Sequence, residues 1–255
     1  MNSRAQKLAI VEGSPAAVAA HNKQAWLDLF APDAVVTDPV GSSPHRGHAQ
    51  LARFYDTFIA PNRIAFRPRH DIVCGDTVIR DCTLEITMSD AVALQVPVHL
   101  RYEMASSEKL ASLSAHWELP GMVTQLLSKG LPAIPVATRL TGRLLQNQKL
   151  TGTAGFARGF HRVGAAHKRT AAQLLRTAAA DDALPQNLRV QYGTATAAAT
   201  STDLLTGWEA DKFIAAGTFV TASLTRGTEH AVAMIEFHGR APLALTVFVD
   251  DPAHP

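Results

Sequence analysis

The sequence is poor in the residue types that mark several common classes of protein. It contains two cysteines, Cys74 and Cys82, in 255 residues, so no disulfide framework is expected, and neither has metal-ligand spacing. No apolar run approaches the roughly 20 residues of a membrane-spanning helix. Lys7 and Glu12 interrupt the stretch in which a signal-peptide core would form. We therefore expect a cytoplasmic protein with reduced thiols, no metal and no cofactor.

Charge is also sparse, and it is unevenly spread. Charged residues make up 18% of the chain and the net charge is +2, which is too small to indicate a nucleic-acid-binding protein. Between Leu119 and Ala180 there is no Asp or Glu, whereas nine Lys and Arg residues lie between Lys129 and Arg176. We call residues 129–176 the basic segment. A solvated helical surface would explain it, and so would peripheral contact with an anionic membrane or an acidic partner.

The N-terminal part is predicted to be helical. One short helix is expected from Arg4 to Glu12, where Gly13-Ser14-Pro15 offers a C-terminal cap, an N-cap and a first helical proline. A second helix should continue to Phe30, loosened near Asn22. A short strand over 34–37 ends at the Asp38-Pro39 turn signal, and apolar spacing predicts a further helix over 47–58.

After Pro61 the apolar period changes from helical to two. Strands are predicted over 77–88, 92–103 and 110–119, with hairpin turns between them. In the middle strand the apolar residues alternate with polar ones, His99 among the latter. Helices followed by an antiparallel meander indicate the α+β class, with the helices covering the apolar face of the sheet.

The chain is expected to fold as two parts joined by a connecting segment. We predict a first domain over 1–120, a connecting segment over 121–154 that is basic and punctuated by Pro and Gly, and a second α+β domain over 155–255. The second half repeats features of the first, since FIAAGTFVTASL at 213–224 echoes DIVCGDTVIRDC at 71–82. Two α+β halves of similar size can also look alike without duplication. A true duplication predicts that the halves pack as an intramolecular pseudo-dimer, and leaves a homodimer open.

One segment carries a specific family resemblance. LFAPDAVVTDPVGSSPHRGHAQLARFY, residues 29–55, resembles the ketosteroid isomerase segment of helix end, strand, Asp-Pro-Val-Gly turn, polar loop and helix. Residues 4–119 thus resemble a ketosteroid isomerase-like, SnoaL-like domain of the nuclear transport factor 2-like superfamily, with a degenerate second copy over 151–252. The resemblance implies a curved antiparallel sheet and helices forming a cone around an apolar pocket. It also implies that Asp38 is a general base.

The remaining site residues follow from the same resemblance, with departures. Ser14 stands where the family has a Tyr that donates to the oxyanion. His99 replaces the family's second donor in one register, whereas the other register drops that donor, and strand parity puts His99 on the polar face. Tyr55 is the remaining candidate donor. The residues expected to line the substrate pocket are Val40, Phe54, Phe58, Leu84, Met88, Val98, Leu100 and Trp117.

Two kinds of function fit these residues. The first is an enzyme that shifts a double bond in a steroid or polycyclic ketone with Asp38 as base, or a related polyketide cyclase or lyase. The second is a non-catalytic module that binds a steroid-like or lipid-like molecule, which the missing donors favour. In both cases the expected partner is an apolar small molecule. A third reading, a scaffold or interaction protein, draws on the basic segment and on a second half with no acid that matches Asp38.

Overall fold

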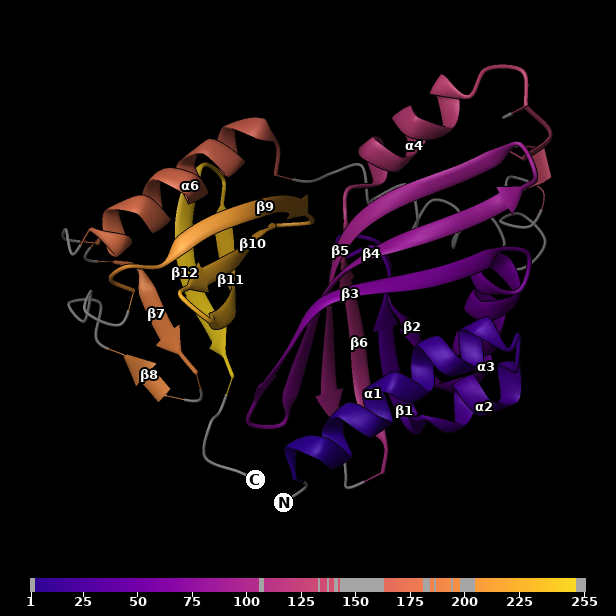
Figure 1. The fold of residues 1–255 in the computed structure, drawn as a ribbon, viewed down its shortest axis with the longest axis horizontal. Helices are drawn as coiled ribbons and strands as arrows, with labels where there is room; N and C mark the ends of the chain where they lie inside the picture. Colours follow the sequence, from indigo (N-terminus) through magenta and orange to yellow (C-terminus); the bar gives the residue numbers. More distant parts are fainter. Residues whose placement is uncertain are drawn as a thin grey trace.

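The computed structural model shows two α+β halves, each built on a six-stranded sheet (Figure 1). It describes residues 3–105, 108–132, 134–136, 138, 139, 142, 163–180, 184, 185, 187–193, 195–197 and 205–250. The predicted α+β class is confirmed.

The first half has its sheet in the order β2-β1-β6-β5-β4-β3, with β1 parallel to β6 and the other neighbours antiparallel. Its strands are β1 (Phe30–Thr37), β2 (His45–Arg46), β3 (Arg63–Cys74), β4 (Thr77–Ser89), β5 (Val92–Met104) and β6 (Leu110–His116). Its helices are α1 (Arg4–Ala19), α2 (Lys23–Asp28), α3 (Gly47–Phe54), the π-helix η1 (Tyr55–Ile59) and α4 (Leu119–Ser128). Apolar residues of α1, α2 and α3 pack with the apolar face of β5 into one core, as its period-two pattern predicts.

The second half repeats this strand order as β8-β7-β12-β11-β10-β9, with β7 parallel to β12. Its strands are β7 (Arg189–Tyr192), β8 (Ala195–Ala197), β9 (Glu209–Ala216), β10 (Phe219–Arg226), β11 (Glu229–His238) and β12 (Ala241–Val249), and helix α6 (Ala165–Ala179) packs on them. Gly75 and Gly217 occupy matching hairpin turns with φ of 55° and 56°. The shared order supports the predicted duplication, which stays a prediction.

The N-terminal helices are divided differently from the prediction. α1 runs without a break through Gly13, Ser14 and Pro15, and the chain turns only after Ala19. Gly13 allows close packing instead of capping a helix, because a Cβ there would lie 2.8 Å from Leu29 Cδ2. Ser14 is buried and its Oγ accepts a hydrogen bond from Trp26 Nε1 at 3.2 Å. Gly13 and Ser14 therefore make tertiary contacts instead of capping a helix, and a local sequence signal does not reveal such contacts.

The two sheets pack against each other on the face of the first sheet that points away from its helices (Figure 1). An apolar cluster joins them, made of Ile72, Cys74, Ile79, Val232, Met234 and Phe248. The guanidinium of Arg101 lies 5.2 Å from the centre of the Phe248 ring. An intramolecular pseudo-dimer would need a contact of this kind, and the pseudo-dimer stays a prediction.

A buried polar network lies beside this cluster and includes His99. The imidazole of His99 is fully buried, with Nδ1 2.7 Å from Thr221 Oγ1 and Nε2 3.0 Å from Ser223 Oγ. Ser223 Oγ donates to Asp81 Oδ2 at 2.7 Å, and the ammonium of Lys212 pairs with the same carboxylate. Burial and the nearby Lys212 charge hold the pKa of His99 well below its usual 6.5. Strand parity correctly puts His99 on the polar face of β5, and the second sheet covers this face at His99.

The connecting region is only partly described. α4 occupies the start of the predicted 121–154 segment, and much of the basic segment lies outside the described residues. Within the described part, Lys129 and Arg139 are exposed, whereas Lys168 pairs with Glu118 at 2.6 Å. None of the helices in the described ranges is long and apolar enough to cross a membrane.

Candidate functional site

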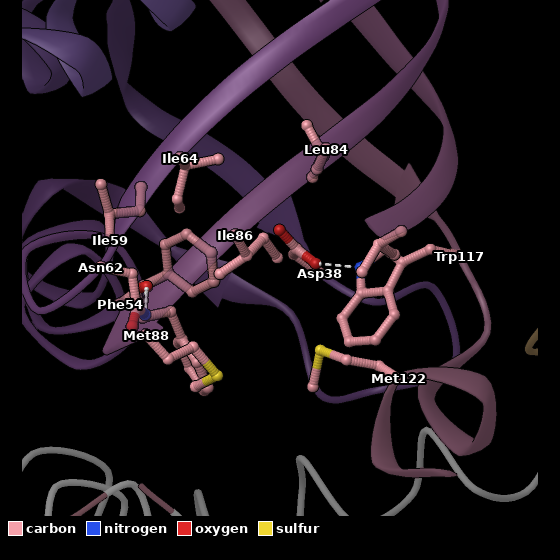
Figure 2. Close-up of a pocket in the computed structure, with 12 residues that line it drawn as sticks. Asp38, Phe54, Ile59, Asn62, Ile64, Leu84, Ile86, Met88, Trp117 and Met122 are labelled. Atoms are coloured by element: carbon pink, nitrogen blue, oxygen red, sulfur yellow. Dashed lines mark hydrogen bonds between the residues drawn. The ribbon is translucent and has the colours of Figure 1, made fainter. Parts of the chain in front are cut away.

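An apolar pocket opens between the first sheet, the α3–η1 helix and α4 (Figure 2). Its described lining consists of Asp38, Phe54, Phe58, Ile59, Asn62, Ile64, Leu84, Ile86, Met88, Val96, Trp117 and Met122. Asp38 is the only charged residue in this described set. The space free inside is about 90 Å³, which is below the roughly 300–1,000 Å³ of pockets that enclose drug-sized ligands. A four-ring ligand would therefore require lining side chains to move, and Met88 and Met122 are of the flexible kind that can do so.

Asp38 is placed by the end of β1. The strand stops at Thr37, and the Asp38–Pro39 peptide bond is cis. The next residue is tied to β6, because Val40 N donates to Ala115 O at 2.8 Å. The carboxyl group points into the pocket between Trp117 and the aliphatic lining (Figure 2).

The chemistry of this carboxyl group is set by its apolar surroundings and by one donor. Burial raises the pKa of Asp38 from its usual 3.8 to about 6. The indole Nε1 of Trp117, which follows β6, donates to Asp38 Oδ1 at 2.5 Å, and this hydrogen bond acts in the opposite direction on the pKa. Asp38 is thus mostly ionised at neutral pH, and its pKa lies close to that pH, which suits a general base.

Few other polar groups face the pocket in its described part. The amide of Asn62 lies well apart from Asp38 and Trp117 (Figure 2), and its Nδ2 donates to Phe58 O at 2.7 Å. The one indole N–H near Asp38 is engaged by the carboxylate itself. Among the described lining residues, none therefore supplies a second donor beside Asp38 for an oxygen that becomes negative during a reaction.

The structure brings together most of the predicted pocket residues. Phe54, Phe58, Leu84, Met88 and Trp117 line the pocket with Asp38. The other three lie outside the described lining. Val98 and Leu100 are buried in the core shared with α1 and α2, and Val40 turns toward the second half of the chain. They share strands or loops with lining residues, but the pocket ends at Val96 along β5.

The two further catalytic candidates lie elsewhere. His99 points to the opposite face of β5, where it binds Thr221 and Ser223, so it cannot donate into this pocket. Tyr55 is buried in the core with its ring centre 5.6 Å from that of Trp26, and its hydroxyl has no hydrogen-bond partner among the described groups. Burial and the neighbouring Asp56 raise its pKa. Tyr55 is not a lining residue, so the structure does not bring its hydroxyl to Asp38.

Several lining residues were missed from the sequence. Ile86 and Val96 could have been found, because they alternate in register with the predicted Leu84 and with the apolar face of β5. Met122 could not, since α4 was assigned to the connecting segment. The donor role of Trp117 was also missed, because only the fold brings the ends of β1 and β6 together.

His45 and His48 lie close together in the sequence, but their surroundings do not indicate a metal site. The ring of His45 lies 5.1 Å from that of Phe54, and His48 Nε2 is 3.0 Å from Phe30 O. In the described ranges, no group of three or more His, Cys, Asp or Glu side chains is arranged to hold a metal ion.

Comparison with known proteins identifies the first half. Residues 11–112 match the family model described as the SnoaL-like domain, so this part of the chain is a SnoaL-like domain, as its motifs predict. No curated protein matches the chain.

Similar solved structures cover slightly less than half of the chain. A Δ5-3-ketosteroid isomerase from Mycobacterium sp. is 27% identical, with 46% of this chain and 96% of that one covered and a TM-score of 0.43. A Mycobacterium tuberculosis protein in complex with estradiol-17β-hemisuccinate is 23% identical, with coverages of 46% and 96% and a TM-score of 0.43. An epoxide hydrolase/cyclase-like enzyme of pyran ring formation in the polyether salinomycin is 17% identical, with coverages of 48% and 97% and a TM-score of 0.43.

Proposed function

We propose that the pocket around Asp38 binds an apolar polycyclic ketone, of the steroid class, and that Asp38 shifts a double bond in it as a general base. The observation that carries this proposal is the placement of one carboxylate, Asp38, among described lining residues that are otherwise uncharged and mostly apolar, where burial raises its pKa to about 6. Such a group can hold a proton and return it at neutral pH, which a carboxylate with the ordinary pKa of about 4 does less well.

The reaction is a proton transfer within one substrate molecule. Asp38 removes a proton from the carbon between ketone and alkene. The electron pair of that C–H bond forms a C=C bond to the carbonyl carbon while the π pair of the C=O bond moves to oxygen, which gives a dienolate. The carboxylic acid then returns the proton two carbons away, so the product is the conjugated isomer and Asp38 is ionised again. A cyclase or lyase that begins by removing a proton beside a carbonyl would use the same carboxylate.

A second candidate, a binding module without turnover, is favoured by the lack of a free donor. The indole N–H of Trp117 is held by Asp38, and the described lining offers no other donor at this end of the pocket. The loss of one oxyanion donor typically costs about 100- to 1,000-fold in turnover. An isomerase built on this site should therefore be slow unless the substrate displaces the Trp117 hydrogen bond.

The test measures binding and turnover on the same protein. Purified protein is incubated with a 5-ene-3-ketosteroid, and enone absorbance is followed while steroid binding is measured by Trp fluorescence or calorimetry. Asp38→Asn preserves size and polarity, so the variant should bind the steroid and lose turnover. Asp90→Asn, on an exposed hairpin turn, is the control and should change neither.

Two outcomes separate the candidates. Turnover that is lost in Asp38→Asn but kept in Asp90→Asn supports the isomerase. Steroid binding with no isomerisation above the solvent background, unchanged by Asp38→Asn, would identify a binding module and contradict the isomerase.

A further inference from the structure

The turn between β9 and β10, in the second half of the chain, sits directly on the loop that follows Asp38. A Cβ at Gly217 would lie 3.0 Å from both N and Cα of Gly41 and 3.2 Å from Val40 Cγ1. Real Cβ atoms are almost never found closer, so the two backbones meet with no room for a side chain. Gly217 also has φ of +56°, which favours glycine.

The same hairpin contacts the residues on both sides of Trp117. Ala215 N donates to Glu118 Oε1 at 2.9 Å. The ring of Phe219 meets the His116 imidazole edge-on, with centres 5.8 Å apart. His116 is buried, and burial together with Arg101 lowers its pKa to about 3, so this contact is with a neutral ring at physiological pH.

These contacts are arranged around one hydrogen bond. Asp38 and Trp117 follow different strands, β1 and β6, and their bond of 2.5 Å depends on how the two strand ends are held. The β9–β10 hairpin touches the segment after Asp38 through Gly217, and it touches the neighbours of Trp117 through Ala215 and Phe219. It therefore bridges both strand ends beside the pocket without lining the described part of the pocket.

We propose that the β9–β10 hairpin is a positioning element for the Asp38–Trp117 pair, which makes the second half of the chain part of the working site in the first. Gly217 is its central positioning residue, because its backbone meets the loop after Asp38 with no room for a side chain. The inference rests on the proposed function only in taking Asp38 as the functional carboxylate. Ordinary packing between two sheets would stabilise the chain but would not influence the titration of Asp38.

The experiment compares two glycines with the same backbone geometry. Gly217→Ala places a methyl group against Gly41, whereas Gly227→Ala, at φ of 58°, has nothing within 4 Å of the new Cβ. Both substitutions carry similar backbone strain. The measurements are the free energy of unfolding, the titration of Asp38 by carboxyl ¹³C NMR and the indole N–H signal of Trp117, assigned with Asp38→Asn and Trp117→Phe.

Gly217→Ala should displace the loop and lengthen the hydrogen bond from Trp117. The midpoint of the Asp38 titration should then rise, by as much as about one pH unit, because a donor that favours the ionised form is weakened. The Trp117 indole signal should move as well. Gly227→Ala should lose only the stability that the shared backbone strain costs and leave both signals at their wild-type positions.

A second pair of variants avoids backbone strain in case Gly217→Ala does not fold. Phe219→Ala removes the contact with His116, whereas Phe213→Ala removes a ring from β9 that packs into the second core. Only the first should move the Trp117 signal.

If neither Gly217→Ala nor Phe219→Ala moves the Asp38 midpoint or the Trp117 signal beyond their controls, the hairpin is a packing contact and the inference is wrong. None of these readouts needs turnover. A chain that isomerises no ketosteroid but shows the Gly217→Ala shifts therefore contradicts the proposed function alone.

Discussion

Replacing Asp38 with Asn should make the protein more stable at neutral pH, and the gain can be worked out from its pKa. The pKa of Asp38 is raised from 3.8 to about 6 in the folded protein. Between these values the folded state binds more protons than the unfolded state, so the contribution of Asp38 to stability falls as the pH rises from about 4 to about 6. At about 1.4 kcal/mol per pH unit, the shift of about two units corresponds to about 3 kcal/mol.

Asn removes this dependence, because it has no proton to lose and its Oδ1 can still accept from Trp117. The free energy of unfolding of Asp38→Asn relative to wild type should therefore increase by about 2.4 kcal/mol between pH 4 and pH 7, since the unfolded carboxyl is already partly ionised at pH 4. Urea unfolding followed by circular dichroism at half-unit pH steps measures this difference, with the exposed Asp90→Asn as the control. A difference that stays constant across the range would refute the reasoning, since it would mean that the carboxyl group is not desolvated.

Three further expectations follow from other contacts. Trp117→Phe removes the donor that lowers the pKa of Asp38, so the midpoint of the Asp38 titration, or of a pH–turnover profile, should move to higher pH. The indole of Trp208 has no hydrogen-bond partner in the described part of the chain, so Trp208→Phe should leave the midpoint of the Asp38 titration unchanged. Lys212→Met leaves the Asp81 carboxylate buried without its closest cation and should cost about 3–5 kcal/mol in urea unfolding, and a loss below 1 kcal/mol would contradict this role. If the basic segment contacts membranes, the protein should sediment with anionic vesicles and progressively less as salt rises, whereas equal sedimentation with neutral vesicles would exclude an electrostatic contact.

The polar network between the two sheets makes their packing specific. The Asp81 carboxylate accepts hydrogen bonds from the ammonium of Lys212 and from the hydroxyl of Ser223. Lys212 itself has a φ of 46° and lies where the pairing of β9 with β10 is irregular. Lys212 Nζ also donates to the carbonyls of Cys82 and Val98 at 2.7 and 3.0 Å. A buried charge without these partners is strongly unfavourable, so the network disfavours other ways of packing the two sheets.

The residues of the pocket show how far local sequence reasoning reached. Alternation along β4 and β5 determined which residues face the core, so Leu84 and Met88 were found, and Ile86 could have been found in the same way. The same parity correctly separated His99 from the apolar face. It could not tell what lies on the other side, because parity gives the face of a side chain and not the layer that covers that face.

The sequence by itself determined the α+β class, the SnoaL-like first half and the place of Asp38 at the end of a strand, because these depend on periodicity, turn residues and a motif that is contiguous in the chain. Only the tertiary structure decided that Trp117 donates to Asp38, that His99 is buried between two sheets and that Gly217 rests on Gly41. These contacts join residues about 80 to 180 positions apart, and their distances are set by how strands and sheets pack, which no local pattern encodes.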